Sequence, residues 1–214
     1  MDYRLWTIDC NQSMKPFTNH RGLVATLDRA NVDTDQIIPK QFLKRLGRTG
    51  FGEHLFHDWR QLPDGSLNPD FELNAPRFAG ASILVTRANF GCGSSREHAV
   101  WAIQQAGFAV VIAPTFADIF KNNSVKNGLL TVELKPEEVE EIFQMVGRYA
   151  GLEATVDLSH QRVVLHLAEE IAFHFEIDPA VKDHLINGLD EISLTLQHEA
   201  AIRAFEARDN PPMR

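Results

Sequence analysis

Cysteine is scarce in this sequence, whose 214 residues contain only Cys10 and Cys92. Two cysteines do not make the disulfide framework of a small exported domain, so we expect the reducing cytoplasm as the compartment. They also fall short of the thiolate ligands that an iron–sulfur cluster usually takes. If the chemistry of this protein needs such a cluster, another polypeptide has to supply it.

Long apolar runs and an excess of positive charge are lacking as well. No stretch approaches the roughly 20 apolar residues of a membrane span. Residues 1–20 have no apolar core like that of a signal peptide, and we treat them as a flexible leader. The net charge of −8 argues against nucleic acid or an anionic membrane surface as partner. The composition is that of an ordinary soluble protein, and we expect residues 21–214 to form one domain.

Apolar runs and helical periodicities alternate along the chain, which is the pattern of an α/β fold. Apolar runs that predict strands occur at residues 22–27, 81–86, 108–113 and 129–134, and the run at 108–113 is typical of a strand buried on both faces. Helical patterns follow at residues 99–106, 115–124 and 136–149. Because strand, helix and strand follow one another from residue 81 to 113, we expect a parallel pair there.

The last third of the chain has a different pattern. Residues 150–178 predict a meander of three short strands, and residues 179–208 predict C-terminal helices. Three histidines fall in the meander, and we interpret them as partly exposed sheet residues rather than zinc ligands, because strand spacing does not make them converge: His160, His166 and His174.

The most informative stretch is residues 89–99, Asn-Phe-Gly-Cys-Gly-Ser-Ser-Arg-Glu-His-Ala. It joins a predicted strand to a predicted helix through two glycines, so backbone N–H groups at the helix start can face an anion. Ser94-x-x-Glu97 also fits a capping box, which would be purely structural. A cation at Arg96 opposes the helix dipole, however. Two hydroxyls, a guanidinium and exposed amides together favour a site for a carboxylate or phosphate.

Two further residue groups have alternative interpretations. Asp33 and Asp35 could ligate a metal, but two carboxylates on a turn are more often Asx-turns or helix caps. Cys92 lies beside the serines and could be a nucleophile. We interpret it as a small apolar residue, because no base partner for it is evident in the sequence.

Several motifs resemble one known family. Residues 93–99 are similar to the signature of the swivelling domain of the aconitase superfamily. The resemblance extends over residues 22–208 to the small subunits of bacterial 3-isopropylmalate dehydratase (isopropylmalate isomerase). It rests on Asn31–Pro39, Arg48–Gly52, Pro114–Phe120, Asn187–Asp190 and Leu194–His198. This resemblance implies an α/β fold of the swivelling β/β/α type with a mostly parallel central sheet.

The resemblance also implies a reaction. The family isomerises 2-isopropylmalate to 3-isopropylmalate in leucine biosynthesis, through dehydration to 2-isopropylmaleate and rehydration. A four-iron four-sulfur cluster, expected on a large partner subunit, acts as Lewis acid on the substrate hydroxyl. We expect this chain to bind no cofactor or metal itself and to be inactive without the large subunit. The closest alternatives are another substituted malate as substrate, such as homoaconitate or citramalate, and a binding module that performs no chemistry.

Site residues follow from matching the motifs position by position. The family's base corresponds to Ser94, while Ser95 and Arg96 would hold a substrate carboxylate. The remaining expected substrate-binding residues lie in two loops: Asp33, Thr34 and Asp35 in the first, Lys44 and Arg45 in the second. No arginine occurs from Asn31 to Ile38, where aconitases bind a third carboxylate, and this departure fits a substrate with an isopropyl group.

Overall fold

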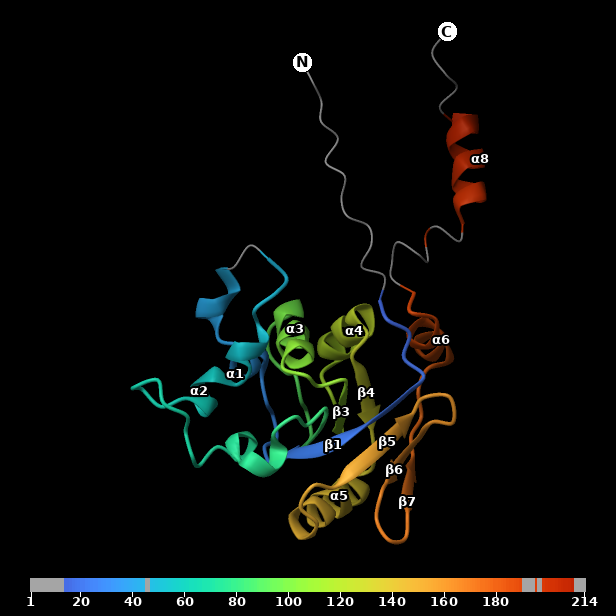
Figure 1. Ribbon diagram of the computed structural model, residues 1–214. Helices are drawn as coiled ribbons and strands as arrows, with labels where there is room; N and C mark the ends of the chain where they lie inside the picture. Colours follow the sequence, from blue (N-terminus) through green and yellow to red (C-terminus); the bar gives the residue numbers. More distant parts are fainter. Residues whose placement is uncertain (1–13, 45–46, 190–194, 196–197, 210–214) are drawn as a thin grey trace.

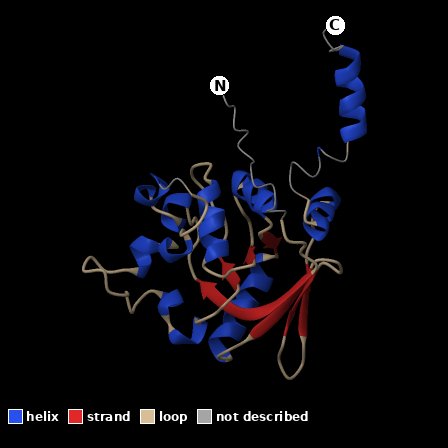
Figure 2. Cartoon of the chain, turned by 45° about the horizontal axis from the view of Figure 1, so that its top comes forward, coloured by secondary structure: helices blue, strands red, loops and turns tan. Residues whose placement is uncertain are grey.

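The computed structural model describes residues 14–44, 47–189, 195 and 198–209. Its centre is a seven-stranded sheet of order β4-β3-β2-β1-β5-β6-β7 (Figures 1 and 2). The four strands at one end are parallel: β1 (Asn19–Leu27), β2 (Ile83–Thr86), β3 (Val110–Ala113) and β4 (Leu130–Glu133). The other three form the antiparallel meander: β5 (Glu153–Asp157), β6 (Arg162–Leu165) and β7 (Ile171–His174).

The long strand β1 joins the two parts of the sheet. Its second half, from Val24, pairs in parallel with β2, and its first half pairs antiparallel with β5. The side chains of β2 and β3 are all buried, as expected for strands covered on both faces. The α/β class and the predicted parallel pair of residues 81–86 and 108–113 are therefore confirmed.

Helices cover both faces of the parallel part. Figure 1 shows α5 on the opposite side of the sheet from α3 and α4. The main helices are α3 (Glu97–Gln105), α4 (Asp118–Asn127), α5 (Pro136–Arg148), α6 (Pro179–Asn187) and α8 (Glu199–Asp209). Single turns are α1 (Thr34–Ile37), α2 (His57–Arg60), η1 (Lys40–Lys44), η2 (Gly52–His54), η3 (Glu72–Asn74) and η4 (Pro76–Phe78).

Strand β1 and helix α4 have bounds that differ from the sequence predictions. Strand β1 begins at Asn19 instead of residue 22, and the N–H of Phe17 already donates to the carbonyl of Leu185, so residues 17–20 belong to the folded body rather than to a leader. Helix α4 covers 118–127 instead of 115–124. Helix α8 stands apart from the sheet in both views, and its ion pair, Arg203–Glu199, lies within the helix.

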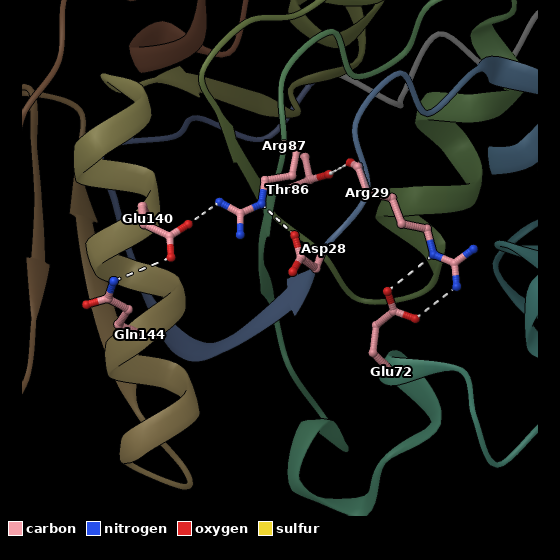
Figure 3. A network of polar contacts seen from close by, with 7 residues as sticks. All are labelled: Asp28, Arg29, Glu72, Thr86, Arg87, Glu140 and Gln144. Atoms are coloured by element: carbon pink, nitrogen blue, oxygen red, sulfur yellow. Dashed lines mark hydrogen bonds and ion pairs between the residues drawn. The ribbon is translucent and has the colours of Figure 1, made fainter.

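Charged side chains hold the ends of β1 and β2 together (Figure 3). The guanidinium of Arg87 bonds to Asp28 and to Glu140 of α5, each at 2.6 Å. Arg29 pairs with Glu72, and the Thr86 hydroxyl donates to the Arg29 carbonyl at 3.1 Å. These contacts fix the first residues of the two loops that leave β1 and β2. None of the helices in the described ranges is long and apolar enough to cross a membrane.

Candidate functional site

The site predicted from the sequence is built on two adjacent loops at the carboxyl ends of β1 and β2. The loops continue side by side beyond the sheet, because N–H groups of one reach carbonyls of the other. Asn31 donates to Ala88, Gly91 to Val32 and Thr34 to Cys92, at 2.8–2.9 Å. Two segments that are far apart in the sequence thereby form one surface.

The two glycines of the turn have steric reasons to be glycine. Gly91 and Gly93 have φ values of +77° and +95°, a region that favours glycine. A Cβ on Gly91 would lie 2.5 Å from the Cβ of Phe120, and one on Gly93 would lie 3.3 Å from the Cβ of Asp33. The turn can therefore pack against both α4 and the β1 loop.

Ser94 and Ser95 are not buried, and neither hydroxyl has a hydrogen-bond partner among the residues that the structure describes. The backbone at Ser94 is nevertheless held, because its carbonyl accepts the hydroxyl of Thr34 at 3.0 Å. Thr34 itself is only 2% exposed, so this anchor is buried. The two hydroxyls are thus presented to the outside on a fixed backbone.

The alternative interpretation of Ser94 and Glu97 as a capping box is wrong. Helix α3 begins at Glu97, its N-cap position is Arg96, and no side chain caps it. Ser94 lies too far from the helix start for the required bond, because the backbone at Arg96 is still extended, with φ −131° and ψ 110°. The carboxylate of Glu97 instead accepts from Asn127 of α4 at 2.9 Å.

Arg96 has a counter-ion in the β1 loop. One guanidinium nitrogen contacts the Asp35 carboxylate, and Lys40 lies 3.5 Å from the other oxygen of Asp35. The hydrogen bond from Arg96 lowers the pKa of Asp35 below its ordinary value, and the charge of Lys40 acts in the same direction. The Arg96 side chain is only 11% exposed, so this cation is held in place by a partly exposed carboxylate before any ligand arrives.

Asp33 does not face the same way as Asp35. Its carboxylate caps helix α1, accepting the N–H groups of Asp35 and Gln36 at 2.7 and 2.9 Å. The side-chain oxygen of Gln36 accepts the N–H of Asp33 at 2.9 Å, which completes a capping box. The structure therefore uses the Asp33 carboxylate as a helix cap. In the described part of the chain, no three His, Cys, Asp or Glu side chains are grouped so that they could hold a metal ion.

The other predicted residues are placed less fully. Lys44 ends the 3-10 helix η1, and Arg45 lies outside the described residues. Cys92 is half-buried, and burial raises the pKa of its thiol, which disfavours the thiolate that a nucleophile or a metal ligand requires. The meander histidines do not converge: His160 bonds to Asp157 and His166 to Thr155.

Sequence reasoning did not single out one pair in this surface. Asn31 and Asn89 both have positive φ, 56° and 61°, and the Asn89 amide donates to the Asn31 side-chain oxygen at 2.9 Å. Asparagine is among the non-glycine residues that tolerate this conformation best, so the two asparagines in these loops were the available signal. They fix where the two loops turn.

Comparisons with known proteins agree on the family. Residues 14–137 match the family model of the aconitase C-terminal domain, and residues 191–209 match that of the C-terminal domain of 3-isopropylmalate dehydratase small subunits. The 3-isopropylmalate dehydratase small subunit of Desulforapulum autotrophicum is 56% identical over 91% of this chain and 96% of its own length. That of Geobacillus kaustophilus is 58% identical over 92% of this chain and 99% of its own.

A solved structure supports the fold. The crystal structure of 3-isopropylmalate dehydratase from Methanocaldococcus jannaschii aligns with a TM-score of 0.62 at 23% identity, covering 88% of this chain and 99% of that one. At this identity the likeness concerns the fold alone. The two small subunits named above are each more than 50% identical to this chain over more than 90% of its length. The chain therefore belongs to the family of 3-isopropylmalate dehydratase small subunits.

Proposed function

We propose that this chain forms one half of a hydro-lyase site that converts 2-isopropylmalate to 3-isopropylmalate through 2-isopropylmaleate, as a step of leucine biosynthesis in the cytoplasm. The observation that supports this best is the pair of accessible hydroxyls, Ser94 and Ser95, directly before a nearly buried arginine. A hydroxy diacid needs both a base at the reacting carbon and a cation for its carboxylate.

Ser94 acts as the base. In the dehydration direction its oxygen takes the proton from the carbon next to the hydroxyl-bearing carbon, and in the rehydration direction it returns a proton. A serine hydroxyl is a weak base, so its alkoxide has to be stabilised by fixed charge and amides. Two features support this role. Arg96, two residues after Ser94 in the sequence, is positively charged, and the exposed Ser94 hydroxyl has no hydrogen-bond partner among the described residues.

Arg96 and Ser95 bind a carboxylate of the substrate. The Arg96 guanidinium has N–H groups besides the one bonded to Asp35, so it can donate to Asp35 and to the ligand at the same time. Asp35 keeps the guanidinium oriented, Thr34 holds the Ser94 backbone and Asp33 shapes the loop through its helix cap. Lys44 and Arg45 contact the substrate from the following loop.

The rest of the site comes from the large subunit. A small subunit implies a large one, and this chain does not fit a cluster: Cys10 and Cys92 are too few, and burial raises the pKa of the Cys92 thiol. The cluster of the partner, when present, supplies Lewis acidity toward the substrate hydroxyl. Proton transfer and carboxylate binding remain with this chain.

The experiment is turnover of 2-isopropylmalate by this chain, alone and after anaerobic mixing with a cluster-loaded large subunit, followed by absorbance of the unsaturated intermediate. We expect turnover only in the mixture. In the assembled enzyme Ser94→Ala should lower kcat by about 10²–10⁴-fold, the usual contribution of a base. Ser159→Ala, at an exposed serine in the β5–β6 turn, should leave kcat unchanged.

The outcomes distinguish the alternatives. An assembled mixture that is silent on 2-isopropylmalate contradicts this substrate and points to another substituted malate. Turnover by the pure chain contradicts the half-site. If Ser94→Ala keeps full activity, the base is another residue. If the two chains do not assemble at all, a binding module is the better description.

A further inference from the structure

The last residue of α4, Asn127, uses every polar atom of its side chain. Its Nδ2 donates to Glu97 Oε1 at 2.9 Å and to the Asn123 carbonyl at 2.8 Å. Its Oδ1 accepts the indole N–H of Trp101 at 2.8 Å. Its backbone carbonyl also accepts from the Gln104 amide at 2.7 Å. One residue of α4 is thus bonded to three residues of α3.

These bonds reach the start of α3, where the chain needs support. Glu97 is the first residue of the helix, directly after Arg96, and no side chain caps this helix. The two bonds that hold Ser94 and Arg96 come from the β1 loop, from Thr34 to the Ser94 carbonyl and from Asp35 to the Arg96 side chain. The bond from Asn127 to Glu97 holds the same segment from the other side.

The two sides hold different groups. Asp35 binds the guanidinium of Arg96, whereas Asn127 binds the helical turn that follows it, through Glu97 and through Trp101 one turn later. If Asn127 loses its donors, Arg96 keeps its counter-ion, but the helix start is free to move away from α4. A displacement of about 1 Å at reacting groups can reduce a rate by about 10²-fold.

We propose that Asn127 is a positioning residue that sets the place of Ser94 and Ser95 relative to Arg96 by fixing the first turn of α3. This role rests on the proposed function of these three residues. Asn127 acts through Glu97 and Trp101 and touches no reacting atom. Because Arg96 keeps its own anchor, disturbing Asn127 should lower kcat more than it raises KM.

The chain contains a matched control for this residue. Asn187 also ends a helix directly before a glycine with positive φ, and its Nδ2 also donates to the carbonyl four residues earlier and to a carboxylate, at 3.0 and 2.8 Å. The corresponding glycines, Gly128 and Gly188, have φ values of 75° and 62°. Asn187 bonds to Asp183 of its own helix instead of to α3. Substitution at Asn187 therefore reports the cost of losing a helix-end asparagine alone.

The test compares Asn127→Asp with Asn187→Asp in the assembled two-subunit enzyme. Each substitution replaces the amide donors by a carboxylate, which then faces the carboxylate of Glu97 in the first variant and that of Asp183 in the second. We expect Asn127→Asp to lower kcat by about 10–100-fold with KM changed less than about threefold, and Asn187→Asp to leave both constants near wild type. Equal kinetics of the two variants, or a loss confined to KM, would overturn the proposal.

A second substitution separates positioning from general loss of stability. Adding Glu97→Gln to Asn127→Asp reverses the direction of the bond, since the glutamine amide can donate to the new carboxylate, which still accepts from Trp101. We expect the double variant to recover at least about tenfold in kcat over Asn127→Asp, the equivalent of one restored hydrogen bond of about 1.4 kcal/mol. A double variant no faster than the single one would refute positioning.

Hydrogen exchange of the isolated chain keeps this inference separate from the proposed function. Amides of residues 100–103, which bond to the carbonyls of the first turn, should exchange faster in Asn127→Asp than in wild type or Asn187→Asp, and protection should return in the double variant. If the wild-type complex does not turn over 2-isopropylmalate, the proposed function is wrong. The exchange data still show whether Asn127 fixes the start of α3. Unchanged exchange at residues 100–103 would contradict it whatever the substrate.

Discussion

Replacing Gly91 by alanine tests the packing of the signature turn against α4. The residue has φ +77°, and an added Cβ would lie 2.5 Å from Phe120 Cβ and 2.6 Å from its Cδ2. Phe120 is 2% exposed and packs against Phe90 and Phe116, with ring centroids 5.3 and 6.2 Å away, so its ring has little room to move. Two separate penalties follow: a left-handed alanine costs about 1–2 kcal/mol, and overpacking costs about 1–3 kcal/mol.

We therefore expect Gly91→Ala to lower the free energy of unfolding by about 2–5 kcal/mol. The measurement is chemical denaturation with unchanged m, so that the shift in midpoint reports stability. Gly151→Ala is the matched control, because Gly151 has φ +76° and no atom within 4 Å of its added Cβ. It should cost only the backbone part, about 1–2 kcal/mol. The reasoning is refuted if Gly91→Ala is no more destabilising than Gly151→Ala.

Three further predictions concern charge and reactivity. Asp35→Asn should destabilise the isolated chain by about 1 kcal/mol, a value discounted for partial exposure. Because the pKa of Asp35 is lowered in the folded state, this difference should persist above the ordinary value of 3.8 and disappear as the pH falls through the folded-state pKa, which denaturation at neutral pH and at a series of pH values below 3.8 would show. Arg87→Met should remove the cation–π contact with Phe143, 3.8 Å from the ring centroid and worth about 1 kcal/mol, together with the bonds to Asp28 and Glu140, and a thermal melt unchanged from wild type would contradict this. Cys92 should react with iodoacetamide at pH 8 more slowly than a cysteine peptide does, because burial raises the pKa of its thiol. The Cys10→Ser variant leaves Cys92 as the one thiol that can react. Equal rates for the protein and the peptide would argue against burial.

Local patterns were sufficient for much of this protein. Continuous apolar runs such as residues 108–113 mark strands buried on both faces, and helices follow them where the period changes. The glycines at 91 and 93 indicated a turn that needs positive φ, and the spaced motifs around Ser94 pointed to the family. These features depend on neighbouring residues in the chain, which is why they can be recognised without a structure.

Contacts between distant segments decided the rest. The sequence places Ser94 three residues before Glu97, as in a capping box, but in the structure the helix starts at Glu97, whose carboxylate accepts a hydrogen bond from Asn127 of α4. Asp33 and Asp35 look equivalent in the sequence, yet one caps a helix and the other pairs with Arg96, 61 residues away. Such pairings depend on which loops the sheet brings side by side. Sheet order is a property of the whole chain, so only the tertiary structure could assign these partners.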